Sequence, residues 1–236
     1  MPPPLDPRGA LFLDMDGTLI DLAVTPQAVQ VPPGLPETLR RVQAALGGAL
    51  AVISGRKLAD IDDLLGPGLP CAAEHGALLR GADGTITAVA RRLGHYDEWL
   101  KILREAAAAM PGVLIEEKAF SLVAHYRQAP RFESALRRLV ERLAAADSEA
   151  AVLPAHCAFE LKPRLGNKGE ALAWFMETDP FRGRLPVYIG DDVTDEPAIR
   201  KAAELGGLGL HVKRDFAGST AQVRAWIARA GAAGAG

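Results

Sequence analysis

The chain has 236 residues, of which 49% are hydrophobic and 24% are charged. These values are typical of a globular protein with one large domain or two smaller ones. A formal net charge of -2 gives no electrostatic reason to expect nucleic acid or an anionic membrane as the main partner. Two cysteines are too few for a disulfide framework, and neither a signal peptide nor a membrane-spanning apolar run is recognisable. We therefore expect a cytoplasmic protein.

Short apolar strands alternate with amphipathic helices at both ends of the chain. In the first part, strands are predicted at 11–13, 49–53 and 70–73, and helices at 37–46 and 58–65. In the last part, helices are predicted at 168–177, 195–204 and 220–230, and strands at 185–189 and 208–212. This alternation predicts an α/β fold, in which a parallel sheet carries helices on both faces.

The pattern changes in the middle of the chain. Helices are predicted there at 97–109 and 131–146, and strands at 113–118, 121–126 and 157–162. Two helices and a mostly antiparallel meander indicate a separate α+β unit inserted into the first domain. We therefore predict a core made of residues 1–92 and 164–236, and an inserted α+β cap at residues 93–163.

Two carboxylates, Asp14 and Asp16, directly follow the first predicted strand and precede Gly17 and Thr18. Ligands of open α/β sheets bind at such strand ends. Two acids that lie side by side repel each other unless a cation or a shared proton compensates their charge. Mg²⁺ takes carboxylate, carbonyl and water oxygens, and it commonly accompanies phosphate substrates. The segment therefore indicates a magnesium site and a phosphate ester.

Three later segments of the core agree with this interpretation. Ser54 and Gly55 follow the second strand, and Lys168 opens a helix, where an ammonium group is electrostatically unfavourable unless an anion compensates it. A second acidic cluster, made of Asp191, Asp192 and Asp195, follows the strand at 185–189. Taken alone, Ser54 is typical of a helix N-cap, and Asp195 is compatible with a role at a helix N-terminus. Taken in order, the four segments favour one phosphoryl-transfer site.

These four segments resemble the signature segments of the haloacid dehalogenase (HAD) superfamily of phosphohydrolases. The resemblance implies a HAD-like Rossmannoid core in which Asp14 is the nucleophile, and Asp16 is the general acid and then the general base. It also implies Mg²⁺ held by Asp14, the Asp16 carbonyl and Asp191, with Asp192 and Asp195 in support. Gly17, Thr18, Ser54, Gly55 and Lys168 would then bind the phosphate. This assignment agrees with the chemistry, because an aspartyl-phosphate divides one difficult hydrolysis into two easier steps.

The predicted cap sits between the Ser54 and Lys168 segments, as in the type C2 cap of that superfamily. Its segments 113–118, 122–127 and 159–163, together with 73–76 and 166–169, resemble the trehalose-6-phosphate phosphatase family. The resemblance implies that Glu116, Lys118 and Glu160 contact hydroxyl groups of the disaccharide, with Arg127 nearby. Residues two apart on a strand share a face, so Glu116 and Lys118 should point together and Glu117 should point away.

Several alternatives remain open at this stage. The substrate could be another sugar phosphate, such as sucrose 6-phosphate, and a phosphomutase or a sugar-phosphate sensor without turnover would share much of this pattern. His125 is better explained as a structural residue than as a catalyst, since no step requires imidazole. Glu74 and His75 are compatible with a substrate contact or with a hinge anchor. We expect a monomer that acts on a small sugar phosphate, with a separate trehalose-6-phosphate synthase elsewhere in the pathway.

Overall fold

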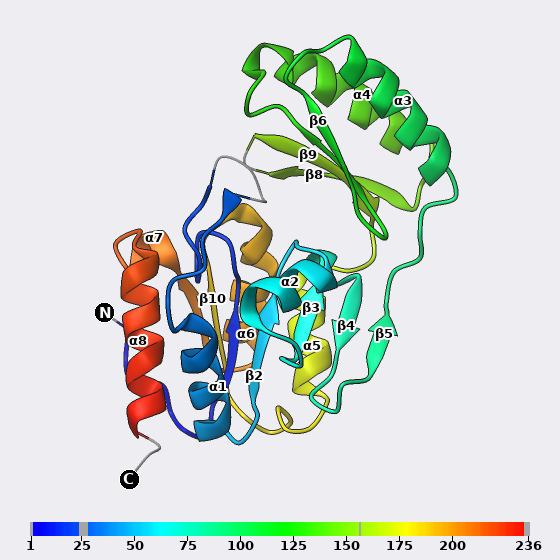
Figure 1. Ribbon diagram of the computed structural model, residues 1–236. Coiled ribbons are helices and arrows are strands. Elements are labelled where there is room, and N and C mark those ends of the chain that lie inside the picture. The colour runs from blue at the N-terminus through cyan, green and yellow to red at the C-terminus, as the bar shows by residue number, and fades with distance from the viewer. Residues whose placement is uncertain (1, 24–27, 156, 234–236) are drawn as a thin grey trace. The chain divides into compact units, whose positions relative to one another are not determined.

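The computed structural model describes residues 2–23, 28–155 and 157–233, and the chain divides into two compact units (Figure 1). Unit 1 consists of residues 1–88 and 167–236, and unit 2 of residues 89–166. Each unit has its own sheet and its own cluster of buried apolar side chains. No helix of the described residues is both long enough and apolar enough to cross a bilayer.

Unit 1 contains a seven-stranded sheet in the order β11-β10-β1-β2-β3-β4-β5. Its parallel strands are β11 (Leu208–His211), β10 (Pro186–Gly190), β1 (Ala10–Leu13), β2 (Leu50–Ile53) and β3 (Cys71–Ala73). All residues of β1, β2 and β10 are buried, which requires cover on both faces of the sheet. The α/β architecture predicted from the sequence is therefore confirmed.

Two antiparallel strands extend this sheet where the sequence predicts no strand. They are β4 (Leu78–Arg80) and β5 (Ile86–Ala88), each only three residues long, and every residue of β5 is exposed. Such short segments carry no readable periodicity, which explains the omission. Arg80 holds β4 in place, because its Nε donates to the Leu69 carbonyl at 2.9 Å and its guanidinium forms a bidentate ion pair with Asp62.

The helices of unit 1 are α1 (Leu35–Ala45), α2 (Leu58–Leu65), α5 (Lys168–Met176), α6 (Glu196–Glu204), α7 (Val212–Asp215) and α8 (Thr220–Ala233). Helix α1 packs against α8, and α5 packs against α6. The centre of the core is aromatic, since the Phe12 ring lies 5.9 Å from that of Phe175 and 5.4 Å from that of Phe181. These contacts fix α5, and with it Lys168, against β1.

Unit 2 contains a four-stranded antiparallel sheet in the order β6-β7-β9-β8. The strands are β6 (Leu114–Glu117), β7 (Leu122–His125), β9 (Ala158–Pro163) and β8 (Ala150–Ala155), and the helices are α3 (Tyr96–Ala108) and α4 (Glu133–Ala145). Strand β8 was not predicted. It is an edge strand rich in alanine and interrupted by Pro154, so its sequence lacks the usual strand pattern.

The strand register of unit 2 separates an apolar face from a polar one. Leu122, Ala124, Phe159 and Leu161 pack into the apolar cluster with α3 and α4. Glu116 lies opposite Val123, and Val123 lies opposite Glu160, so these three side chains share the other face. Glu116 and Glu160 therefore project from the face that the helices leave uncovered.

Candidate active site

Three neighbouring parallel strands of unit 1 bring the predicted core residues to one edge of the sheet. Leu13 of β1 pairs with Ile189 of β10 on one side and with Val52 of β2 on the other. Asp14, Asp191 and Ser54 follow at the carboxyl ends of these three strands. This is the edge at which open α/β sheets bind their ligands.

Asp14 is buried at this edge, with 4% of its surface exposed. Its Oδ1 accepts a hydrogen bond from Lys168 Nζ at 2.5 Å, and its Oδ2 accepts one from Thr18 Oγ1 at 3.3 Å. Burial and the charges of Asp195 and Asp191 raise the pKa of Asp14 well above its usual range, and Lys168 opposes the shift. A carboxylate in this position needs additional positive charge to stay ionised.

Lys168 is the first residue of α5, and its helix is capped by Asn167, whose side chain accepts hydrogen bonds from Gly169 N and Glu170 N. The ammonium group is buried and bridges Asp14 and Asp195, with Nζ to oxygen distances of 2.5 and 2.6 Å. Burial alone would lower the pKa of Lys168, but the two carboxylates raise it above its ordinary value. Lys168 is therefore a buried, charged ammonium rather than a solvated helix-end lysine.

Asp195 orients this lysine and is itself fully engaged. Its carboxylate accepts hydrogen bonds from Lys168 Nζ at 2.6 Å, from Tyr188 Oη at 2.5 Å, and from the backbone N–H groups of Asp191 and Asp192 at 3.0 Å each. Burial would raise the pKa of Asp195, but Lys168 and Tyr188 hold it below its usual value. Asp192 has a different role, because its Oδ1 caps the next turn by accepting from Val193 N.

The arrangement of carboxylates fits a divalent cation. Oxygen atoms of Asp14, Asp191 and Asp195 lie within 4.8 Å of one another. Burial, followed by the charge of Asp195, raises the pKa of Asp191 to about 6. An all-oxygen donor set with this much unbalanced negative charge suits a hard cation such as Mg²⁺. Since Asp195 already accepts four hydrogen bonds, Asp14 and Asp191 are the side chains best able to hold the ion.

Gly17 permits the close approach that this cluster requires. Its φ is +79°, and a Cβ atom built there would lie 2.1 Å from Asp191 Oδ2. Any side chain at position 17 would displace Asp191 from the cluster. The Gly17 that follows the two acids in the sequence is therefore required by the geometry of the site.

Ser54 begins a turn that is not a helix cap. Helix α2 begins at Leu58 after the N-cap residue Lys57, so the alternative interpretation of Ser54 as an N-cap is wrong. Ser54 is buried, and its Oγ accepts a hydrogen bond from Arg56 N at 3.2 Å. Gly55 is needed here because a Cβ atom would lie 2.5 Å from His75 Nε2.

Glu74 and His75 support this turn from the next strand. Both have a left-handed backbone, with φ values of 48° and 59°. This conformation is uncommon for residues other than glycine and is concentrated at functional sites. The N–H of Glu74 donates to the Arg56 carbonyl and the N–H of His75 donates to the Ser54 carbonyl, both at 2.9 Å. The two residues thus support the Ser54 turn, a role that the sequence did not suggest.

Arg56 is a site residue that sequence reasoning missed. Its Nε donates to Asp16 Oδ2 at 2.7 Å, and its Nη2 donates to Asp16 Oδ1 at 2.6 Å. The available signal was its position directly after Ser54 and Gly55, where a cation would adjoin a site rich in carboxylates. The structure therefore pairs Asp16 with a guanidinium group, whereas Asp14 is paired with an ammonium group.

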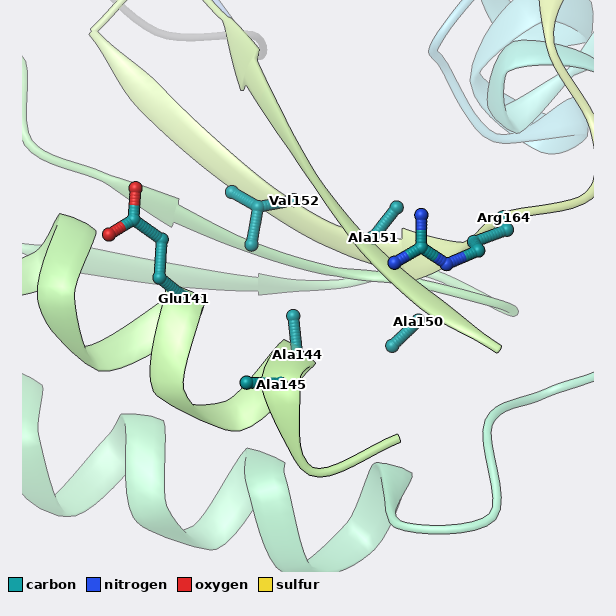
Figure 2. Close-up of a pocket in the computed structure, with 7 residues that line it drawn as sticks. All are labelled: Glu141, Ala144, Ala145, Ala150, Ala151, Val152 and Arg164. Carbon is teal, nitrogen blue, oxygen red and sulfur yellow. The ribbon is translucent and has the colours of Figure 1, made fainter. Parts of the chain in front are cut away.

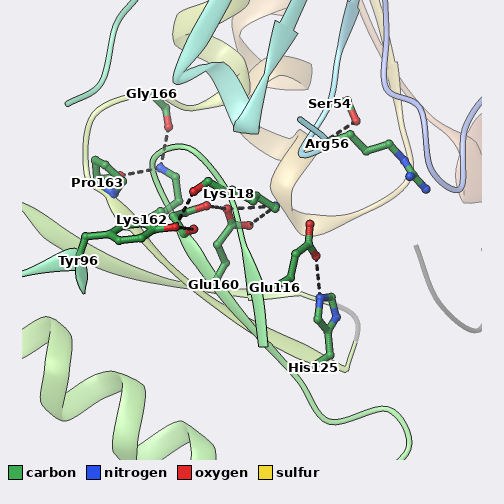
Figure 3. Close-up of polar contacts among 11 residues, drawn as sticks. Ser54, Arg56, Tyr96, Glu116, Lys118, His125, Glu160, Lys162, Pro163 and Gly166 are labelled. Atoms are coloured by element: carbon green, nitrogen blue, oxygen red, sulfur yellow. Dashed lines mark hydrogen bonds and ion pairs between the residues drawn. The ribbon is translucent and has the colours of Figure 1, made fainter. Parts of the chain in front are cut away.

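In unit 2, the predicted cap residues form two hydrogen-bonded groups (Figure 3). Glu116 Oε2 lies 2.8 Å from His125 Nε2, and burial would raise the pKa of Glu116, but His125 and Lys118 hold it below its usual value. Both oxygens of Glu160 lie 3.3 Å from Lys118 Nζ, and Oε1 accepts from Ser121 Oγ at 2.5 Å. Ser121 is a second residue that the sequence did not single out.

Three further charged residues of unit 2 lie outside these two groups, and one of them, Glu117, points in the direction that strand geometry predicts. Glu117 pairs with Arg104 of α3, on the helix side of the sheet, so it points away from Glu116. Arg127 lies half-buried in the turn after β7, outside the strands. Lys162 is buried, and its Nζ donates to the carbonyls of Pro163 and Gly166 at 2.8 and 2.7 Å (Figure 3). Lys162 therefore stabilises the end of β9.

A hollow elsewhere in unit 2 lies between α4 and β8 (Figure 2). Small apolar side chains line most of it, and Glu141 and Arg164 are its only charged lining residues. None of the residues predicted for the site lines this hollow.

Comparison with known proteins identifies the family. The sequence profile described as trehalose-phosphatase matches residues 12–225. The chain belongs to the trehalose-phosphatase family. It is therefore a phosphatase, and the resemblance noted in the sequence is confirmed.

Individual relatives agree with the family match. The chain is 43% identical over 205 residues to a probable trehalose-phosphate phosphatase of Sinorhizobium fredii, covering 86% of this chain and 77% of the relative. It is 37% identical over 217 residues to a trehalose-6-phosphate phosphatase of Escherichia coli, covering 89% and 79%.

Solved structures show the same fold. The C-terminal domain of C. albicans trehalose-6-phosphate phosphatase has a TM-score of 0.80 at 18% identity, covering 95% of this chain and 92% of that chain. A solved phosphatase of the HAD superfamily also shares the fold, with a TM-score of 0.54 at 17% identity. The HAD-like fold class predicted from the sequence is thereby confirmed.

Proposed function

We propose that the chain hydrolyses trehalose 6-phosphate to trehalose and inorganic phosphate in an Mg²⁺-dependent reaction, as a step of trehalose biosynthesis. The observation that carries the proposal is the buried Asp14, held by Lys168 and Thr18 at the carboxyl end of β1 in a chain of the trehalose-phosphatase family. The names of the relatives from S. fredii and E. coli support trehalose phosphate as the substrate class.

Asp14 would act as the nucleophile. Its oxygen attacks phosphorus, the bond from phosphorus to the sugar oxygen breaks, and Asp16 gives its proton to the departing oxygen. Asp16 then accepts a proton from the water that attacks the aspartyl-phosphate, which releases phosphate and restores Asp14. The two acids are held by different cations, Asp14 by Lys168 and Asp16 by Arg56, so each is positioned independently of the other.

Asp14, Asp191 and the backbone carbonyl of Asp16 would hold Mg²⁺, with Asp192 and Asp195 in support. When bound, the ion neutralises charge between the nucleophile and the phosphoryl oxygens. Lys168 supplies a fixed positive charge to the same oxygens, and Ser54, with Gly17, Thr18 and Gly55, would bind the rest of the phosphate.

Substrate recognition would belong to unit 2. Glu116, Lys118 and Glu160 offer charged donors and acceptors on one face of its sheet, which suits a ligand with many hydroxyl groups. Arg127 would contribute from the adjoining turn. We further expect the enzyme to act in the cytoplasm as a monomer, with its substrate supplied by a separate synthase.

The test is phosphate release from trehalose 6-phosphate, glucose 6-phosphate and sucrose 6-phosphate, each with Mg²⁺ and with EDTA. We expect the enzyme to turn over trehalose 6-phosphate, EDTA to abolish this turnover and Mg²⁺ to restore it. Ca²⁺ should inhibit the reaction, because Ca²⁺ prefers more ligands at longer distances than Mg²⁺ does. Preferred turnover of sucrose 6-phosphate would assign another substrate. Binding of trehalose 6-phosphate without phosphate release would indicate a sensor.

A further inference from the structure

The ion pair between Arg56 and Asp16 joins two segments of unit 1 that lie 40 residues apart in the sequence. It is bidentate, with Nε and Nη2 on different oxygens at 2.7 and 2.6 Å. The side chain of Arg56 is 10% exposed and that of Asp16 is 31% exposed. A planar guanidinium group fixes a carboxylate in orientation as well as in position. Asp16 is therefore held in one defined orientation.

The backbone of Arg56 is itself held on both sides. Its N–H donates to Ser54 Oγ at 3.2 Å, and its carbonyl accepts from Glu74 N at 2.9 Å. This support gives the guanidinium group a fixed starting point, so that its hold on Asp16 does not depend on a mobile loop.

We infer that Arg56 is a positioning residue for Asp16, one that sets the direction from which Asp16 delivers its proton to the departing oxygen. This inference rests on the proposed function, in which Asp16 is the general acid. Asp16 is the more exposed of the two acids after β1, and among the described residues no buried lysine pairs with it as Lys168 does with Asp14. Arg56 supplies that orientation. The alternative is that Arg56 binds the phosphate of the substrate directly.

Leaving groups of different quality separate the two roles. An alkoxide such as that of a sugar needs a proton in order to leave, whereas p-nitrophenolate leaves without one. The parameter kcat/KM contains only the steps up to departure of the leaving group, so it excludes the later use of Asp16 as a base. A residue that orients the acid affects poor leaving groups selectively, and a residue that binds phosphate affects all esters equally.

The experiment measures kcat/KM of the Mg²⁺-loaded enzyme for trehalose 6-phosphate and for substituted phenyl phosphates. The variants are Arg56→Gln, Arg56→Lys, Asp16→Asn and the double variant Arg56→Gln/Asp16→Asn. The matched control is Asp62→Asn, which breaks another bidentate arginine pair of unit 1, with Arg80. Thermal melting verifies that each variant is folded.

For Arg56→Gln we expect kcat/KM to fall about 10- to 100-fold on trehalose 6-phosphate and less than about threefold on p-nitrophenyl phosphate. For Arg56→Gln, the dependence of kcat/KM on leaving-group pKa should become steeper and approach that of Asp16→Asn. Adding Arg56→Gln to Asp16→Asn should change kcat/KM less than about twofold. Arg56→Lys should fall between wild type and Arg56→Gln, because an ammonium group lacks the planar fork. Asp62→Asn should leave the leaving-group dependence unchanged.

Equal losses on all esters, or losses that multiply in the double variant, would overturn the inference and assign Arg56 to the phosphate or to the fold. Failure of the proposed function has a different signature, since the wild-type enzyme would then release no phosphate from trehalose 6-phosphate. The phenyl phosphate series would still test Arg56 in that case.

Discussion

The two units of the molecule build their polar groups in different ways. In unit 1, charged side chains follow the ends of three parallel strands, where register alone brings Asp14, Asp191 and Ser54 to one edge. In unit 2, they project from the interior of antiparallel strands, where register places Glu116 and Glu160 on one face. The polar side chains of unit 1 therefore meet at one place on the sheet edge, whereas those of unit 2 are spread over one face of the sheet.

This difference predicts different tolerance to substitution. In unit 1, Lys168 joins two buried carboxylates, and Asp195 accepts four hydrogen bonds, so the loss of any member leaves a buried charge without its partner. In unit 2, Glu116 with His125 and Glu160 with Lys118 and Ser121 form smaller groups. Substitutions of Asp14, Lys168 and Asp195 should therefore affect every ester, whereas substitutions on the polar face of unit 2 should affect esters selectively.

The largest effect is expected for Asp14→Asn, which removes the nucleophile and one metal charge together. Turnover of both trehalose 6-phosphate and p-nitrophenyl phosphate should fall by at least about 10³-fold. The fold should remain, because the amide oxygen can still accept from Lys168 Nζ while the amide N–H donates to Thr18 Oγ1. Kinetics with saturating Mg²⁺ and thermal melting test this. Substantial residual turnover of either ester would exclude the aspartyl-phosphate assignment.

The sequence was sufficient to predict which core residues of unit 1 come together, because most of them directly follow predicted strands and Lys168 opens a predicted helix. Asp14 and Asp16, Ser54, Lys168 and the 191–195 cluster are each readable locally, and the parallel sheet then brings them together. It was not sufficient for Arg56, whose partner lies 40 residues away, nor for the bracing role of Glu74 and His75, which depends on an unusual backbone. Periodicity reports burial and does not report which side chains meet.

Glu160→Ala is the clearest test of the selective effect expected for substitutions in unit 2. If Glu160 binds a sugar hydroxyl, its loss costs about 1.5–3 kcal/mol, or roughly ten- to a hundredfold in kcat/KM for trehalose 6-phosphate. Hydrolysis of p-nitrophenyl phosphate should change little, because that ester has no sugar. Comparing kcat/KM for the two esters measures this selectivity.

The matched control is Glu117→Ala. Glu117 pairs with Arg104 on the helix side of the same sheet, so its loss should be mild for both esters. Equal losses on both esters for Glu160→Ala would mean that Glu160 supports folding. No loss on either ester would remove the cap face from the recognition site.

Ser121→Ala should have a smaller effect of the same kind. Ser121 Oγ donates to Glu160 Oε1 at 2.5 Å, and Lys118 still holds both oxygens of Glu160 when that donor is lost. We expect kcat/KM for trehalose 6-phosphate to fall about three- to tenfold, in line with a typical hydrogen bond of about 0.5–1.5 kcal/mol, because Lys118 retains part of the hold on Glu160. Adding Ser121→Ala to Glu160→Ala should cause no further loss, and an additive loss would show that Ser121 acts independently of Glu160.

The register of unit 2 explains why sequence alone could not connect these residues. The alternation of Glu116, Glu117 and Lys118 predicted correctly which side chains share a face. The partners Ser121 and Glu160 lie 39 residues apart, and β8, which completes the sheet, has no strand signature. The pairing of β7 with β9 is what brings Glu160 to Ser121 and Lys118.

The smallest effect, and the one with the least obvious sign, concerns the stability of the metal-free protein. Asp191 has its pKa raised from 3.8 to about 6 by burial and by Asp195. Between about pH 4 and 6, the folded protein therefore holds a proton that the unfolded chain has lost, so stability falls as the pH rises through this window.

The substitution Asp191→Asn replaces the carboxylate with an uncharged amide and so removes this loss of stability. In EDTA at pH 7, it should melt about 2–4 °C above wild type, with the difference disappearing near pH 4, while Mg²⁺ should stabilise wild type more than the variant. A variant that melts below wild type in EDTA at pH 7 would show that Asp191 stabilises the fold by itself, and that unit 1 does not depend on a cation to balance its carboxylates.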